Sequence, residues 1–109
     1  MDDTLWHTLL FDYYGDLLTE RQQECYDLYY NSDLSLQEIA DNCGISRQGV
    51  WEQIHRAEKA LQRFEARTGQ VARALRRRET LQRLAAVAER LADSPEKREI
   101  LAGLQELSD

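Results

Sequence analysis

Apolar residues recur along this chain at helical spacing, and no segment alternates with the two-residue period of a half-buried β-strand. β-Branched residues are also scarce, so the pattern predicts an all-α fold. Near the N-terminus, four apolar side chains fall on one helical stripe: Leu5, Leu9, Leu10 and Tyr13. We expect Gly15 to end this first helix.

Two capping boxes predict where the next helices begin. Thr19 with Gln22, preceded by the apolar Leu18, begins one helix, and Ser35 with Glu38 begins the other. Three residues share one face of the first of these helices: Leu18, Cys25 and Tyr29.

The segment after Ser35 has the arrangement of a helix-turn-helix motif. Ala40 is small enough to let two helices approach closely, Gly44 supplies a left-handed turn, and Ser46 caps a helix that extends to about Arg67. Two residues flank the turn and point inward: Cys43 and Ile45. Four apolar residues repeat along the second helix as a buried stripe: Val50, Ile54, Ala57 and Leu61. Together these features predict a helix-turn-helix domain.

The opposite face of the second helix carries the candidate nucleic-acid-binding residues: Arg47, Gln48, Trp51, Glu52, His55, Arg56, Lys59 and Arg63. Residues near its N-terminus would meet base edges, where arginine pairs with guanine and glutamine with adenine. Arg56, Lys59 and Arg63 lie further along and would meet the phosphates of double-stranded DNA. A solvated helix face or a protein-binding face would have the same pattern, so these alternatives stay open.

Two residues on that face favour the alternatives. Glu52 would repel phosphate unless it accepts a hydrogen bond from a cytosine. Trp51 is large and apolar beside Val50, which favours a core position against Trp6 of the first helix over contact with DNA.

The C-terminal third predicts two further helices. A turn near Thr68 and Gly69 leads to a helix over about 70–92, and Ser94 with Pro95 begins the last helix. The apolar stripe of the first is Leu81, Leu84, Ala85, Ala88 and Leu91, and that of the second is Ile100, Leu101, Leu104 and Leu107. We therefore expect a helix-turn-helix domain over residues 1–67 and a C-terminal helical arm over residues 68–109.

Two helices alone cannot fully bury both stripes of this arm. Either they pack against the N-terminal core, or a second copy of the chain completes a four-helix cluster. We favour the second arrangement and expect a homodimer.

The net charge of −6 is unevenly distributed. Residues 1–45 hold ten acids and one arginine, residues 46–90 hold eleven bases and five acids, and residues 91–109 hold five acids and two bases. The basic block begins where the candidate DNA-reading helix begins, so the local field there favours a polyanion despite the negative total. A second arginine cluster follows at positions 73–83, and Arg76, Arg83 and Arg90 form one stripe. This stripe would suit phosphate binding or a solvated helix face.

Composition also excludes several classes of protein. No apolar run approaches the roughly 18 residues of a membrane span, and the acidic N-terminus lacks the basic flank of a signal peptide, so we expect a cytoplasmic protein without membrane association. Cys25 and Cys43 lack metal-ligand or disulfide-scaffold spacing, and we expect both to be small core residues. No glycine-rich phosphate loop or nucleophile–base pattern is present, so we expect no cofactor and no enzymatic activity.

The segment "LTERQQECYDLYY…LSLQEIADNCGISRQGVWEQIHRAEKAL", residues 18–61, resembles region 4 of bacterial sigma factors. Over residues 8–67, "FDYYGDLLTERQ", "LYYNSDLSLQEIA" and "GISRQGVWEQIHRAEKAL" are more closely similar to the YlxM family. The first resemblance implies a fold in the winged-helix-like DNA-binding superfamily. It also places Glu58 where sigma factors often have a base, which weighs against sigma-like affinity for DNA.

The YlxM resemblance implies a cytoplasmic DNA-binding regulatory protein of a Gram-positive-type bacterium, linked to the signal recognition particle pathway. Within that resemblance, Arg47, Gln48, Glu52 and Arg56 are the recognition-helix positions. The alternative is an adaptor that does not bind DNA and instead binds the particle's GTPase or its RNA.

Overall fold

The computed structural model describes residues 3–108, without the side chain of Asp3, and every regular element in this range is helical, which confirms the predicted all-α class. The elements are α1 (Asp3–Tyr14), the 3-10 turn η1 (Gly15–Leu17), α2 (Glu20–Tyr30), α3 (Leu36–Cys43), α4 (Arg47–Thr68), α5 (Gln70–Glu89) and α6 (Pro95–Ser108). The chain divides into two compact units between Val71 and Ala72. Within residues 3–108, none of the helices has the length and hydrophobicity of a membrane-spanning segment.

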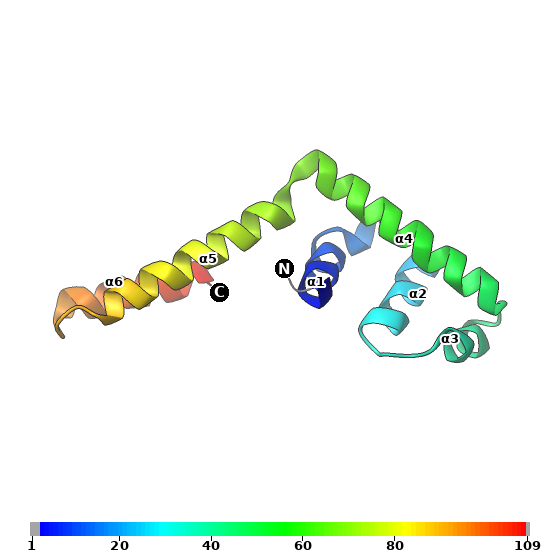
Figure 1. Cartoon of the computed structure of the whole chain (residues 1–109), viewed down its shortest axis with the longest axis horizontal. Coiled ribbons are helices and arrows are strands. Elements are labelled where there is room, and N and C mark those ends of the chain that lie inside the picture. Colours follow the sequence, from blue (N-terminus) through cyan, green and yellow to red (C-terminus); the bar gives the residue numbers. More distant parts are fainter. Residues whose placement is uncertain (1–2, 109) are drawn as a thin grey trace. The chain divides into compact units, whose positions relative to one another are not determined.

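In the first unit, α1, α2 and α3 lie along one side of α4 (Figure 1). The four residues of the predicted α4 stripe are all buried: Val50, Ile54, Ala57 and Leu61. Ile39 and Ala40 of α3 pack with Val50 and Ile54, so the close approach expected at Ala40 is confirmed. This packing is what holds the helix-turn-helix pair together.

The capping boxes and the glycine turn predicted at the helix ends are also confirmed. Thr19 with Gln22 and Ser35 with Glu38 each form a complete capping box. The backbone N–H of Ser35 donates to the Glu38 carboxylate and holds the pKa of that group below its ordinary value. Gly44 has φ 67°, as the turn requires, because a side chain is strained in this left-handed conformation.

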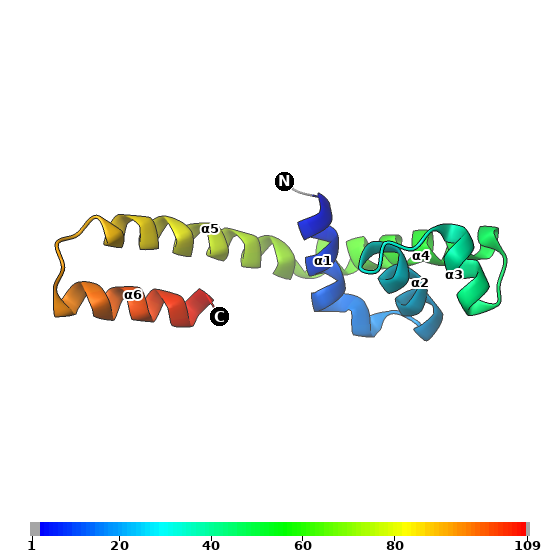
Figure 2. The same cartoon turned by 90° about the horizontal axis from the view of Figure 1, so that it is seen from below.

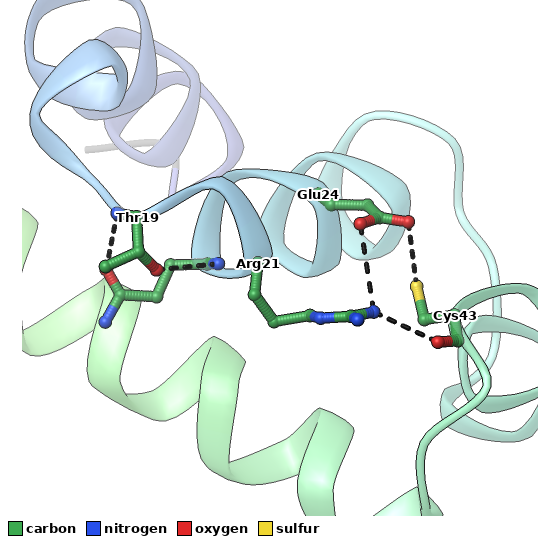
Figure 3. A network of polar contacts seen from close by, with 5 residues as sticks. Thr19, Arg21, Glu24 and Cys43 are labelled. Carbon is green, nitrogen blue, oxygen red and sulfur yellow. Dashed lines mark hydrogen bonds and ion pairs between the residues drawn. The ribbon is translucent and has the colours of Figure 1, made fainter.

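Arg21 and Glu24 of α2 contact Cys43 at the turn of the helix-turn-helix motif (Figure 3). The Arg21 guanidinium donates to the carbonyl of Cys43 at 3.1 Å and lies 3.8 Å from Glu24, while the Cys43 thiol donates to Glu24 at 3.1 Å. Cys43 is half-buried and Cys25 is fully buried, which agrees with their expected core roles. Burial raises the pKa of the Cys25 thiol to about 11, so it is protonated at neutral pH.

Glu65, near the end of α4, is the buried charged residue of this unit's described core. Its Oε1 accepts hydrogen bonds from the Tyr14 hydroxyl at 2.6 Å and from the backbone N–H of Val71 at 2.9 Å. The Tyr14 hydroxyl also lies 2.5 Å from the Thr68 hydroxyl. Glu65 therefore ties the end of α1 to the start of α5, where Gly69 closes α4 with φ 64° at the predicted turn.

Two expectations for α1 and α2 were wrong. Tyr13 is 41% exposed and Tyr14 is buried in its place, where its hydroxyl donates to the buried Glu65. Tyr29 is 39% exposed, and Tyr26, beside Cys25, takes the buried position. The expected end of the first helix at Gly15 is confirmed, because α1 ends at Tyr14, although Gly15 begins the 3-10 turn η1 and does not adopt a left-handed conformation.

In the second unit, α5 and α6 lie side by side and run in opposite directions (Figure 2). Ser94 caps α6 as predicted, with its hydroxyl accepting from the backbone N–H of Lys97 at 3.0 Å. The Lys97 ammonium donates to the carbonyls of Glu89 and Leu91 and so satisfies the C-terminal end of α5, which ends before the expected residue 92.

The apolar stripes of the second unit are only partly covered. Leu81 and Ala88 of α5 are buried, whereas no described residue of α6 is buried. Leu84 and Leu91, which belong to the predicted α5 stripe, are exposed, and so are three other large apolar side chains: Val87, Ile100 and Leu107. The expectation that two helices alone cannot fully bury both stripes is therefore confirmed.

Candidate nucleic-acid interface

All eight candidate residues lie exposed on α4: Arg47, Gln48, Trp51, Glu52, His55, Arg56, Lys59 and Arg63. We refer to them as the α4 surface. At 100° per residue they cover the side of the helix opposite its buried stripe. One straight helix therefore presents all of them on a single surface.

The first turn of α4 is positioned by the residues that precede it. The Ser46 hydroxyl accepts from the backbone N–H of Gly49 at 2.9 Å and fixes where the helix begins. Val50 is fully buried against α3, so Arg47 and Gln48 must point away from the core. They occupy the end of the helix from which a helix-turn-helix protein contacts bases.

The charge on the α4 surface is predominantly positive. Arg47, Arg56, Lys59 and Arg63 are cationic, and Glu52 is the single carboxylate among the eight. The two ion pairs found within residues 3–108 are Arg21–Glu24 and Lys97–Glu89, so neither neutralises a cation of this surface. These side chains are available to an anionic partner.

One edge of the α4 surface borders a basic hollow of about 350 Å³. Arg56, Lys59 and Arg63 line it from α4, and Leu17 and Gln22 line it from η1 and α2. Three cationic side chains thus converge on one hollow beside the first turn of α2. Phosphate oxygens suit this arrangement because they accept charge-assisted hydrogen bonds.

The other edge of the surface is aromatic. Trp51 is 48% exposed, and its ring stacks on that of His55, with centroids 4.9 Å apart and an interplanar angle of 12°. The expected core position of Trp51 is therefore wrong. The reason is geometric, since Val50 takes the core position and the next residue is rotated by about 100° out of it.

The sequence did not indicate the contact that Glu58 makes between two helices. The Tyr30 hydroxyl donates a hydrogen bond to the Glu58 carboxylate, which links α2 to α4 beside Trp51. Burial, reinforced by this carboxylate, raises the pKa of Tyr30 well above its ordinary value, so its hydroxyl remains a donor. No spacing rule could have paired these residues, which lie 28 positions apart.

The second arginine cluster lies in the other unit, on α5. All of its members are exposed: Arg73, Arg76, Arg77, Arg78 and Arg83. Arg90, just beyond the end of α5, is exposed as well. Exposure is compatible with both phosphate binding and a solvated helix face.

A family model described as "Putative helix-turn-helix protein, YlxM / p13 like" matches residues 1–101 of the chain. The chain belongs to this family, UPF0122. The match agrees with the motif formed by α3 and α4 and confirms the resemblance drawn from the sequence.

Some relatives in the UPF0122 family match almost the whole chain, and others match about two thirds of it. A UPF0122 protein of Symbiobacterium thermophilum is 50% identical over 105 residues, which are 96% of this chain and 97% of the relative. One from Halalkalibacterium halodurans is 39% identical over 107 residues, or 98% of each chain. A third, from Thermoanaerobacter pseudethanolicus, is 50% identical over 72 residues, covering 66% of this chain and 62% of the relative.

Proposed function

We propose that this UPF0122 protein is a cytoplasmic DNA-binding regulatory protein, with no catalytic activity of its own, and that α4 enters the major groove of double-stranded DNA. The observation that carries this proposal is the α4 surface, on which four cations without an ion-pair partner in the described chain follow the turn of a helix-turn-helix motif. Arg47 and Gln48 are the candidates for base contacts.

Phosphate contacts would come from the basic hollow. Arg56, Lys59 and Arg63 converge there beside the start of α2, in the part of α4 that lies beyond the base-reading turn. Glu52 sits between the two groups, where it would accept from the amino group of a cytosine or oppose binding. The net positive surface favours modest affinity dominated by phosphate contacts.

Binding to duplex DNA is therefore expected to depend strongly on salt. About four phosphate contacts per chain give a log–log slope near −4, so a fourfold rise in salt weakens binding by roughly two orders of magnitude. Fluorescence anisotropy with labelled duplexes over a salt series measures this slope. Absence of binding to any duplex at about 50 mM salt would remove the DNA proposal.

A second candidate function is an adaptor of the signal recognition particle that binds its GTPase or its RNA. Exposed Trp51, an aromatic side chain of the kind enriched in protein interfaces, favours this candidate. Co-purification of the GTPase that survives nuclease treatment would support a protein-binding adaptor, and loss on treatment would point to nucleic acid as the link.

We also propose that the protein is a homodimer joined through the second unit. What supports this is the apolar surface that the α5–α6 hairpin leaves exposed, including Leu84 at 45% and Val87 at 51%. A second hairpin would cover these side chains in a four-helix cluster. Each dimer would then present two α4 helices, as proteins that read two half-sites do.

The dimer is expected to dissociate when Leu84 and Val87 are both replaced by glutamine, because the change removes apolar area from the interface and leaves each hairpin's own buried residues in place. Light scattering on the full chain measures the molar mass. Ala86→Gln, also exposed on α5, is the control and should remain dimeric. A monomeric wild-type chain would contradict the proposal.

A further inference from the structure

A second surface of the first unit has a different chemistry from the α4 surface. An open pocket of about 550 Å³ lies between α1 and the end of α2. His7 lines it from α1, Tyr29 and Tyr30 line it from α2, and Asp33 lines it from the loop that follows. The pocket is therefore bounded by aromatic rings and a carboxylate.

This pocket shares two residues with a smaller hollow of about 130 Å³. Tyr29 and Tyr30 line both, and the smaller hollow continues to Trp51, His55 and Glu58 of α4. We refer to the two hollows together as the tyrosine groove. Among the residues that the structure describes, no lysine or arginine lines either part of it.

The aromatic walls of the groove are held in place by their own contacts. The His7 ring stacks on Tyr30 with centroids 4.6 Å apart, and its Nδ1 lies 3.1 Å from the Tyr26 hydroxyl. Tyr29 meets Tyr30 edge to face at 5.0 Å. The groove thus offers positioned ring faces, and binding would require little ordering of its walls.

The charge of the groove is negative. Asp33 stands at the rim with φ 54°, the one described non-glycine residue in the left-handed region, and Glu58 lies at the other end. Asp33 also belongs to a region rich in carboxylates, since residues 1–45 hold ten acids and one arginine. A polyanion would be repelled here, whereas a cation would be attracted.

We propose that the tyrosine groove binds arginine or lysine side chains from a cationic segment of a partner protein. Guanidinium and ammonium groups are the cations that combine cation–π contact with tyrosine or tryptophan faces and charge-assisted hydrogen bonds to carboxylates. The groove supplies both kinds of group. This proposal rests on a surface other than the basic hollow and does not depend on DNA binding.

The two surfaces meet at Trp51 and His55, which belong to the α4 surface and also line the groove. A segment that fills the groove up to these rings would cover one edge of the DNA-binding face. Partner and DNA would then compete for the protein, so the groove provides a means of regulation.

Titration calorimetry of the full chain with an octa-arginine peptide at about 0.15 M salt tests the proposal. Asp33→Asn is expected to weaken binding about tenfold through loss of a charge-assisted contact, and asparagine tolerates the left-handed conformation at this position. Tyr29→Ala is expected to weaken binding about threefold to tenfold through loss of a cation–π contact, and Tyr29→Phe should restore it.

Matched controls change the same residue types outside the groove. Asp16→Asn removes an equal charge from an exposed site, and Tyr13→Ala removes a tyrosine that is as exposed as Tyr29. Both should alter affinity by less than about twofold. If Asp16→Asn weakens binding as much as Asp33→Asn, the peptide responds only to net charge and the groove is not its site.

Failure of the peptide to bind the wild-type chain would also overturn the proposal. Asp33 lies in a loop, so its substitution tests the groove even if Tyr29→Ala destabilises the fold. Peptide binding without any duplex binding would support the groove proposal and contradict the proposed DNA function. Duplex binding without peptide binding would overturn the groove proposal and leave the proposed DNA function in place.

Discussion

Replacing Arg56, Lys59 and Arg63 together with alanine is expected to weaken binding to duplex DNA by about a hundredfold or more at low salt. Each side chain lines the basic hollow, and each is taken to contact one phosphate with about 1 kcal/mol of net free energy or more. The salt slope should fall by about one per contact removed, from about −4 to about −1. Anisotropy titrations over a salt series measure both quantities.

The control for this experiment is a second triple variant with the same change of charge. Arg76, Arg77 and Arg78 are also exposed and lie in the other unit, on α5. Their replacement with alanine should reduce affinity much less than the α4 variant does. If the α5 variant has the larger effect, phosphate binding belongs to the arginine cluster and the α4 surface has another use.

The largest expected effect on stability comes from Glu65. Replacing it with alanine removes the acceptor for the Tyr14 hydroxyl and for the backbone N–H of Val71, both in a buried site. We expect the free energy of unfolding to fall by about 2–3 kcal/mol, because hydrogen bonds to charged groups are worth more than neutral ones and a buried donor is left unpaired. Urea denaturation followed by circular dichroism measures the change.

Two further variants separate the contributions at this site. Tyr14→Phe removes one donor and should cost about 1 kcal/mol, since Glu65 keeps the N–H of Val71. Gln62→Ala, exposed on the same helix, should change stability by less than about 0.5 kcal/mol. If Glu65→Ala unfolds at the same urea concentration as Gln62→Ala, the buried network does not stabilise the fold.

The same network makes the free energy of unfolding depend on pH in the alkaline range. Burial raises the pKa of Tyr14 above its ordinary value of 10.0, so the folded chain holds this proton more tightly than the unfolded chain. The resulting stability is complete below about pH 10 and is lost as the pH rises through the higher value of the folded state. Tyr14→Phe should remove this part of the pH dependence.

Features that depend on neighbours in the sequence could be predicted from the sequence. The capping boxes at Thr19 and Ser35 each need only residues three positions apart, and Gly44 is dictated by the left-handed turn that it makes. The α4 surface follows from periodicity, because it is the side of the helix that the buried stripe leaves outside. For this reason all eight candidate residues were found on one exposed face.

Features that depend on distant parts of the chain could not be predicted from the sequence. Tyr13 and Tyr14 are adjacent and chemically identical, and the choice between them depends on Glu65, which lies 51 positions beyond Tyr14. Trp51 was misplaced because its size and polarity suit both a core and an interface. The tyrosine groove combines residues from α1, α2 and α4, and no local pattern indicates their association.

The most direct measurement of the central claim is the change in backbone amide chemical shifts of the full, isotopically labelled chain during titration with duplex DNA at about 50 mM salt. If α4 reads DNA, the perturbed amides will concentrate in residues 47–63 and at the start of α2, where the basic hollow lies. Perturbations confined to residues 73–83 of α5, or none at all, would contradict the claim that the α4 surface binds DNA.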